Sequence, residues 1–373
     1  MTTETRTLCQ ITAVVNKAFT GAVLDALRAA DVRNIHQVAG RRSVLEERRG
    51  FLAALSTDLV LAEEPADVLF FFVDPEYEDQ ALSVVARAAQ LQVPGHGSVF
   101  SEQCEIGKAH GLYAEKRALI YSGDLVPMFR DMVRLTCIVQ RGQGDHLARV
   151  ALKAGAVPVT TYGTGTGLRD KLGLLRITIP AEKEVLTLCV AGYDADTVIE
   201  LLVEAGKLDQ PGRGFVYQTA VHKGLLDTRI SRGTSAQAAS VEQIITALDN
   251  LQGGMEWRRS GQAARTGKRR SFFGGTDLSL VCDEGHGLDL VDAAMRAGAA
   301  GATIERLKVV VRAKESGKVL TPARVTCRMI VPPDKAGEII DAMEAAGAFS
   351  DQAQGLVGSK PVPKAFTYIP AKA

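Results

Sequence analysis

One order of strands and helices occurs three times in these 373 residues, and it constrains the fold more than any other feature of the sequence. Each copy opens with a short apolar strand, followed by a Gly-containing turn and a helix. The copy continues with a variable segment, a second apolar strand and a second helix, and it closes on a Gly-bearing loop and a short strand. Self-similarity of this kind predicts a repeated structural unit. The opening strands are CQITAVV (9–15), RLTCIVQ (134–140) and LSLVC (278–282).

The helices and the closing segments carry the plainest matches between the copies. The first helix of each copy places a large apolar residue and a cation at matching positions: LDALRAADV (24–32), RVALKAGAV (149–157) and DAAMRAGAA (292–300). The closing segments match through their glycines and the strand that follows: QVPGHGSVFSEQC (92–104), DQPGRGFVYQTAV (209–221) and DQAQGLVGSKPV (351–362).

The order β-α-β-β-α-β predicts an α+β fold of three tandem ferredoxin-like βαββαβ repeats. Helices would cover one face of each antiparallel sheet, and the other face would carry alternating apolar residues without a cover of its own. We therefore expect a monomeric pseudo-trimer in which three sheets bury these faces against each other. The expected units are residues 1–122, 127–233 and 276–373, with a helix and a basic linker at 234–275.

The linker contains a helix-start pattern and then a cluster of positive charge. Ser240 and Gln243 form a capping box ahead of an apolar helical face. The segment MEWRRSGQAARTGKRR (255–270) then places six Lys and Arg residues beside Trp257, the only tryptophan. Two interpretations of residues 257–270 stay open, a solvated tether or a docking tail for an acidic surface such as lipid head groups or a protein.

Composition excludes several function classes. With 44 Lys and Arg against 43 Asp and Glu, the formal net charge is +1, which gives no global field for nucleic acid. The six cysteines are scattered without metal-ligand spacing, and no paired histidine spacing or Ser/His/Asp set is present. The first residues lack a secretory pattern and no apolar run reaches membrane-helix length, so we expect a cytoplasmic protein.

The stretch YGTGTGLRDKLG (162–173) places three glycines at every second position and then a group of charges. It matches neither the dinucleotide-binding nor the Walker pattern. Glycines can take positive φ angles and allow a ligand to approach the backbone closely, and successive N–H groups in such a turn can bind an anion. A plain mobile turn between two strands is the alternative.

A second glycine-rich loop, GKLDQPGRG (206–214), adds two cations among residues that expose backbone donors, and LLDTRISRG (225–233) adds two arginines. Each charge-assisted contact to a phosphate contributes roughly 1.5–3 kcal/mol. Ordinary surface solvation is the alternative for each basic residue. The candidate ligand-binding residues are Gly163, Thr164, Gly165, Gly167, Arg169, Lys207, Gly212, Arg213, Gly214, Arg229 and Arg232.

Over about residues 132–233 the chain resembles the PII nitrogen-regulatory signalling proteins. Tyr162 to Asp170 resembles the start of the family's T-loop. GKLDQPGRGFVY (206–217) resembles the B-loop, with Arg213 where the family has a phosphate-binding lysine. TRISRG (228–233) resembles the basic C-loop.

The resemblance implies a non-enzymatic regulatory protein with an adenine nucleotide, ATP or ADP with or without Mg, in clefts between repeats. AMP or another small anion stays open as the ligand. The loops would control a protein partner, a membrane transporter being one candidate, through segments 163–183, 41–65 and 312–322. His96 and Gln354 stand where the middle repeat has Arg213, so we do not expect every cleft to bind nucleotide.

Two other classes of function stay open. Motif loss in the outer repeats favours a ligand-independent structural adaptor that keeps the shell of the fold. An enzyme that hydrolyses nucleotide slowly, or a protein with a divalent-metal role, is the third hypothesis. We expect no catalytic residue and no metal site.

Overall fold

The computed structural model describes residues 6–47, 59–113, 118–167, 182–232, 272–311, 314–315 and 318–368. The strands are β1 (Arg6–Asn16), β2 (Ile35–Glu47), β3 (Leu59–Val73), β4 (Gly97–Ala109), β5 (Met132–Gln140), β6 (Val159–Gly167), β7 (Glu182–Ala191), β8 (Gly214–Val221), β9 (Lys223–Leu225), β10 (Ser231–Arg232), β11 (Phe273–Asp283), β12 (Gly301–Val311), β13 (Lys314–Glu315), β14 (Lys318–Val319), β15 (Ala323–Val331) and β16 (Leu356–Thr367).

The α-helices are α1 (Thr20–Ala29), α2 (Glu78–Ala88), α3 (Gly144–Lys153), α4 (Ala195–Gly206), α7 (Gly287–Arg296) and α8 (Ala336–Ala345). Single turns of 3-10 helix precede four of them: η1 (Lys17–Phe19), η3 (Pro75–Tyr77), η6 (Glu284–His286) and η7 (Pro333–Lys335). A further turn, η4 (Gly111–Tyr113), follows β4.

Fourteen of the described strands join edge to edge in one sheet that closes on itself, and β13 and β14 form a separate two-stranded sheet. Ten of them form a closed antiparallel barrel in the order β2-β3-β1-β4-β16-β8-β5-β7-β6-β12 and back to β2. β11 and β15 make a second connection between β16 and β12. Closure pairs the backbone groups that open edges would leave exposed.

The expected fold class, α+β with three ferredoxin-like repeats arranged as a pseudo-trimer, is therefore wrong. The protein is mainly β, with six short α-helices in the described part of the chain. Each third of the chain does place four strands in one order, β2-β3-β1-β4, β6-β7-β5-β8 and β12-β15-β11-β16. These strands do not end as separate sheets, because long edge strands such as β16 pair with two other thirds and satisfy their N–H and C=O groups there.

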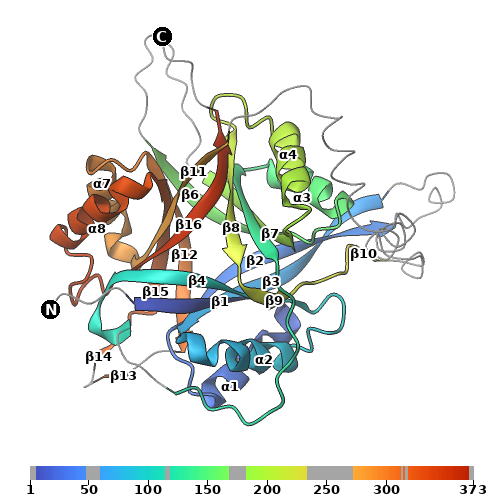
Figure 1. Ribbon diagram of the computed structural model, residues 1–373, viewed down its shortest axis with the longest axis horizontal. Helices are drawn as coiled ribbons and strands as arrows, with labels where there is room; N and C mark the ends of the chain where they lie inside the picture. Colours follow the sequence, from blue (N-terminus) through green and yellow to red (C-terminus); the bar gives the residue numbers. More distant parts are fainter. Residues whose placement is uncertain are drawn as a thin grey trace.

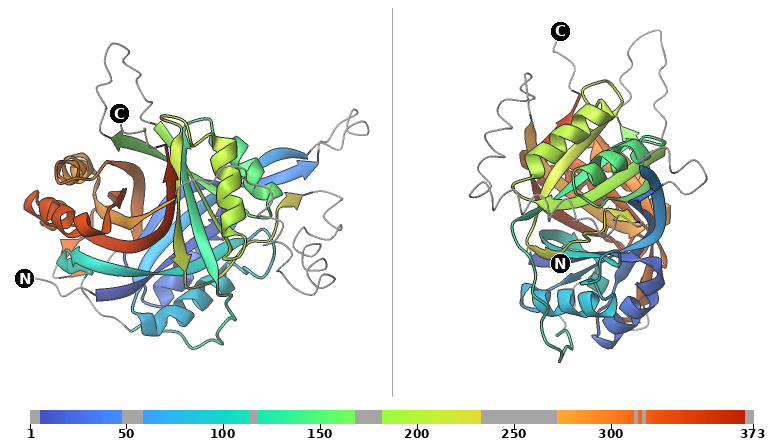
Figure 2. Two further views of the ribbon diagram at one scale, coloured as in Figure 1. Left: turned by 45° about the horizontal axis from the view of Figure 1, so that its top comes forward. Right: turned by 90° about the vertical axis from the view of Figure 1, so that its right-hand side faces the viewer.

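The helices lie on the outside of the strands in three pairs, α1 with α2, α3 with α4 and α7 with α8 (Figures 1 and 2). Each pair covers a separate apolar cluster, because the inward side of each helix carries large apolar residues. Leu27 and Phe71 belong to the first cluster, Leu147 and Leu186 to the second, and Leu290 and Met343 to the third, and all six side chains are buried.

The inner side of the sheet differs from the expectation of alternating apolar faces. Valines and Phe70 line part of it, but a group of charged residues is buried there as well. These are Glu102, Arg134, Asp277, Glu305 and Lys360, with exposed fractions of 0–5%, together with the partly buried Arg328. Buried charges need partners, so strands of different thirds are held together by ion pairs as well as by backbone hydrogen bonds.

None of the described helices is long and apolar enough to cross a membrane. Most of the expected basic linker, residues 234–271, lies outside the described residues, as do 168–181, 48–58 and parts of 312–322 from the expected contact segments. β11 begins at Phe273, inside the stretch that we expected to be linker. The expected unit boundaries stay a prediction.

Candidate functional site

The glycine run 163–167 lies in the extended strand β6 and forms neither a turn nor an anion nest. Gly163 pairs with Lys183 of β7 on one side and Glu305 of β12 on the other, so the ladder uses the backbone of this stretch. None of the three glycines is among the residues with positive φ. A Cβ at Gly163 would lie 2.8 Å from the carbonyl oxygen of Ile304. The glycine therefore allows close approach of a neighbouring strand.

The two trailing arginines lie beside the first third of the chain. Arg229 donates to Glu64 at 2.6 Å, and a Cβ on Gly95 would lie 2.2 Å from its guanidinium carbon. Burial and the nearby charge of Arg42 lower the pKa of Arg229. Arg232 pairs in β10 with Glu46 of β2, and Arg169 lies outside the described residues. No described contact brings these arginines to loop 206–214.

The second loop, Lys207–Gly214, joins α4 to β8 and holds four of the expected site residues. Lys207 ends the helix in the left-handed conformation, and Gly212 and Gly214 have φ angles of 71° and 131°. A Cβ on Gly214 would lie 2.1 Å from the carbonyl oxygen of Ile138, so this position requires glycine. The Gln140 side chain donates to the carbonyl oxygen of Gly212 at 2.7 Å and holds the loop against β5.

The first loop, Gln90–Gly97, joins α2 to β4 and has the same backbone conformation. Gly95 and Gly97 have φ angles of 94° and 136°, and a Cβ on Gly97 would lie 2.0 Å from the carbonyl oxygen of Val14. The residue between the two glycines is His96, whose ring packs against Phe19 with 4.2 Å between ring centroids. Its Nδ1 lies 3.0 Å from the carbonyl oxygen of Ala89.

A carboxylate of the protein itself binds the first loop. The N–H of Gly95 donates to Asp227 at 2.8 Å, and the N–H of Arg229 donates to the same oxygen at 2.9 Å. The other oxygen of Asp227 pairs with the guanidinium of Arg42, which also pairs with Glu64. Burial lowers the pKa of Arg42, and the charge of Asp227 opposes that effect. The anion position of the first loop is thus occupied from within.

The third loop, Gly347–Gly355, is occupied as well. Gln354 has a φ angle of 47°, and its side-chain oxygen accepts from the N–H of Thr321 at 3.1 Å. The guanidinium of Arg324 donates to the carbonyl oxygen of Gln354 at 2.5 Å and to the Tyr113 hydroxyl at 3.0 Å. Arg324 is completely buried, so these contacts hold Gln354 from within the protein.

The second loop alone of the three has an unpaired cation within the described part of the chain. Arg213 is half-buried, and its guanidinium has no hydrogen-bond or ion-pair partner among the described residues. Lys207 is exposed, and the N–H of Gly212 has no acceptor in the described chain. A cation beside a free donor, in a loop whose counterpart binds a carboxylate, is suited to bind an anion.

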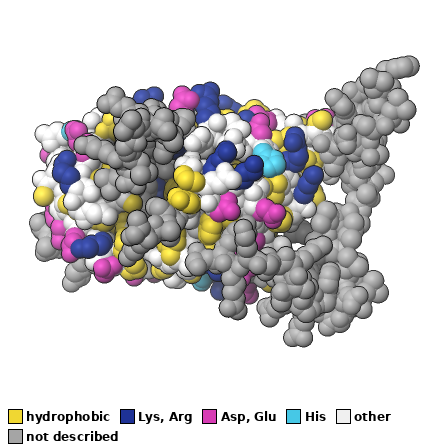
Figure 3. Space-filling model, turned by 90° about the horizontal axis from the view of Figure 1, so that it is seen from above, with side chains coloured by type: hydrophobic (Ala, Val, Ile, Leu, Met, Phe, Trp, Pro, Cys, Tyr) yellow, Lys and Arg dark blue, Asp and Glu magenta, His cyan; other side chains and the backbone are white. Residues whose placement is uncertain are grey.

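The described surface has mixed charge on the face that Figure 3 presents. On the face shown in Figure 3, Lys and Arg side chains are interspersed with acidic and uncharged ones. No group of His, Cys, Asp and Glu among the described residues could hold a metal ion. Sequence reasoning missed Arg42, Glu64 and Asp227, and only the acidic residue next to the arginines of LLDTRISRG could have suggested their pairing.

Comparison with protein-family models and with curated proteins finds no match for this chain.

Proposed function

We propose that this chain is a non-enzymatic regulatory protein that binds the phosphate of an adenine nucleotide at the second loop. One contrast carries the proposal. The N–H of Gly95 in the first loop donates to the carboxylate of Asp227, whereas Gly212 and Arg213 in the matching second loop have no such acceptor in the described chain. An external phosphate would supply the oxygen atoms that Asp227 supplies in the first loop.

The chemistry of the second loop favours a phosphate over an uncharged ligand. The Arg213 guanidinium is planar and can donate two parallel hydrogen bonds to a phosphate, and Lys207 supplies a second positive charge. Contacts of this kind contribute roughly 1.5–3 kcal/mol each. The ligands that we propose are ATP and ADP, with or without Mg, and AMP.

The regulatory part of the proposal rests on the resemblance of residues 206–217 to the PII B-loop. Nucleotide bound at the second loop would change the conformation of neighbouring segments. These segments would contact a protein partner, for which a membrane transporter is the candidate. A ligand-independent structural adaptor is the second candidate. It is favoured by the first and third loops, because Asp227 accepts from the N–H of Gly95 and Ser350 accepts from the N–H of Ala353.

Calorimetric titration of ATP, ADP, AMP and inorganic phosphate into the wild type and Arg213→Ala tests the proposal. We expect Arg213→Ala to weaken nucleotide binding at least tenfold. Arg296→Ala is the matched control, because Arg296 is exposed on α7 and has no partner among the described residues. Equal nucleotide affinity in Arg213→Ala and the wild type, or no binding by either, would contradict the proposal. A partner captured equally with and without nucleotide would favour the adaptor.

A further inference from the structure

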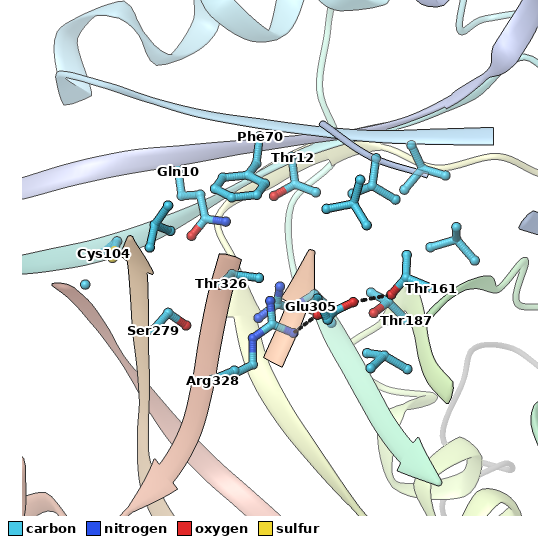
Figure 4. Close-up of a pocket in the computed structure, with 18 of the residues that line it drawn as sticks. Gln10, Thr12, Phe70, Cys104, Thr161, Thr187, Ser279, Glu305, Thr326 and Arg328 are labelled. Carbon is cyan, nitrogen blue, oxygen red and sulfur yellow. Dashed lines mark hydrogen bonds and ion pairs between the residues drawn. The ribbon is translucent and has the colours of Figure 1, made fainter. Parts of the chain in front are cut away.

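The cavity inside the barrel is too small for the base of a nucleotide. Its volume is about 60 Å³, which is about the share of two water molecules (Figure 4). Charged side chains around it already have partners, as Glu305 has in Arg328 and in the hydroxyl of Thr161. A base attached to a phosphate at the second loop therefore has to lie on the outer surface, beside that loop.

The strand that follows each of the first two loops pairs with a segment from the next third of the chain. After the first loop, Val99 of β4 lies opposite Leu225 of β9. After the second loop, Val216 of β8 lies opposite Phe366 of β16 (Figure 1). Both pairings are antiparallel, and each valine lies two positions after the last glycine of its loop. Leu225 and Phe366 are therefore equivalent positions.

The packing of these two side chains supports the same correspondence. Leu225 packs against the apolar cluster beneath α1 and α2, and Phe366 belongs to the cluster beneath α3 and α4. Both thus lie on the helix side of the sheet, and both loops come from that side, because each begins at the end of a helix. Side chains two positions apart along an extended chain share a face. Two positions after Leu225 is Asp227, and two positions after Phe366 is Tyr368.

Tyr368 thus occupies the position from which Asp227 closes the first loop. Asp227 accepts from a backbone N–H of that loop, and the equivalent N–H, that of Gly212, has no acceptor in the described chain. Tyr368 is 38% exposed, and its ring and hydroxyl have no partner among the described residues. The Thr367 hydroxyl donates to the carbonyl oxygen of Gly214 at 3.0 Å, which holds the end of β16 against the second loop.

We propose that Tyr368 binds the base of the nucleotide, with its ring stacked on the base while Gly212 and Arg213 hold the phosphate. This inference rests on the proposed function of the second loop. Aromatic side chains stack on any base, and a purine offers more ring area than a pyrimidine. A phenol, unlike a carboxylate, carries no charge at neutral pH, so it does not compete with the phosphate. Tyr368 therefore leaves the loop open and favours a ligand with an aromatic base.

Three ligands that share the phosphate and the ribose test the role of the ring: AMP, CMP and ribose 5-phosphate. We expect calorimetric titration of the full chain to show the tightest binding for AMP and the weakest for ribose 5-phosphate. Tyr368→Leu should weaken AMP binding about tenfold and leave ribose 5-phosphate unchanged, because only the stacking is lost. Tyr368→Phe should bind AMP as the wild type does, since the ring makes the contact.

The matched control is Phe129→Leu, because Phe129 is 67% exposed and pairs with Gly224 rather than with the second loop. Equal affinity of the wild type for AMP and ribose 5-phosphate would overturn the proposal. So would unchanged AMP binding in Tyr368→Leu, or the same loss of affinity for all three ligands in that variant.

A second pair of variants tests the correspondence between Tyr368 and Asp227. Tyr368→Asp places a carboxylate beside Gly212 and Arg213, and it should weaken ribose 5-phosphate binding about tenfold or more through competition and like-charge repulsion. Tyr368→Asn has the same size without the charge and should leave ribose 5-phosphate unchanged. Equal ribose 5-phosphate affinity in these two variants would contradict the correspondence.

The two proposals fail in different ways. If Arg213→Ala weakens AMP binding and the Tyr368 variants do not, the proposed function stands and this inference is wrong. If the wild type binds none of the three ligands, both are wrong.

Discussion

The first and second loops share one backbone conformation, and they differ in the side chains that bind to it. Gly95 and Gly97 match Gly212 and Gly214 in their positive φ angles. Asp227 nevertheless closes the first loop, whereas the described chain leaves Arg213 in the second loop without a partner. The comparison shows that loop geometry creates the capacity to bind an anion, and that a distant residue decides whether the capacity is free.

The largest expected effect follows from removing the residue that closes the first loop. Asp227→Ala leaves the buried guanidinium of Arg42 with Glu64 alone and the N–H of Gly95 without an acceptor. We expect the free energy of unfolding to fall by about 3–5 kcal/mol, since a broken buried pair leaves an uncompensated charge. Urea denaturation measures it. Asp209→Ala, at an exposed position of the second loop, should change stability by less than about 0.5 kcal/mol. Equal effects of the two substitutions would break the comparison.

The shared backbone is tested at the last glycine of each loop. Gly97→Ala and Gly214→Ala each place a Cβ about 2 Å from a carbonyl oxygen of the facing strand, at a strongly positive φ. We expect both substitutions to lower the free energy of unfolding by about 2–3 kcal/mol or more. Gly21→Ala is the control, because its added Cβ meets nothing within 4 Å. Tolerance of alanine in one loop alone would show that the two conformations are not equivalent.

The third loop extends the comparison to pH, because Tyr113, which bonds to Arg324, also lies beside the buried His36. Burial, with the charge of Arg324, lowers the pKa of His36 from 6.5 to about 3. The unfolded chain binds a proton below pH 6.5 that the folded chain does not, so stability falls as pH decreases from 6.5 towards 3.

His36→Phe removes this titration and should retain about 2 kcal/mol more stability than the wild type at pH 5, relative to pH 8. Unfolding measurements at both pH values provide the test, with His146→Ala at an exposed position as the control. The same loss of stability between pH 8 and 5 in His36→Phe and the wild type would mean that His36 is protonated in the folded protein.

The smallest expected effect concerns the residue between the paired glycines. Arg213→His copies the first loop into the second and should weaken nucleotide binding about tenfold, which corresponds to about 1.4 kcal/mol. His96→Arg should create no new binding, since the N–H of Gly95 already donates to Asp227. Nucleotide binding gained by His96→Arg would show that the arginine suffices and that the carboxylate does not close the loop.

Local sequence patterns predicted part of the secondary structure of this protein, and the predictions that failed have identifiable causes. The order of strands and helices and the loop around Arg213 could be predicted because hydrophobic period and glycine placement act over a few residues. The closed barrel could not be predicted, because the backbone groups at a strand edge form the same hydrogen bonds with any partner strand. Gly163 was expected in a turn, since the close approach of β12 that requires glycine there is a tertiary contact.

The charges inside the barrel were missed for a related reason. Lys360 and Glu102 are 258 positions apart in the sequence, and each by itself resembles a residue on a polar strand face. Their burial is tolerable only because strands from different thirds bring opposite charges together. No local signal distinguishes such a pair from two solvated side chains.

The sequence by itself determined the order of strands and helices and which helix faces are apolar, because both depend on residues a few positions apart. The tertiary structure alone decided which strands close the sheet and which loop is left open. Asp227 lies 132 positions from Gly95 in the sequence and still accepts a hydrogen bond from it. Nothing in the sequence of the second loop shows that this loop receives no such carboxylate from the described chain. Pairing over that distance depends on the assembled barrel, which brings the two segments within hydrogen-bond range.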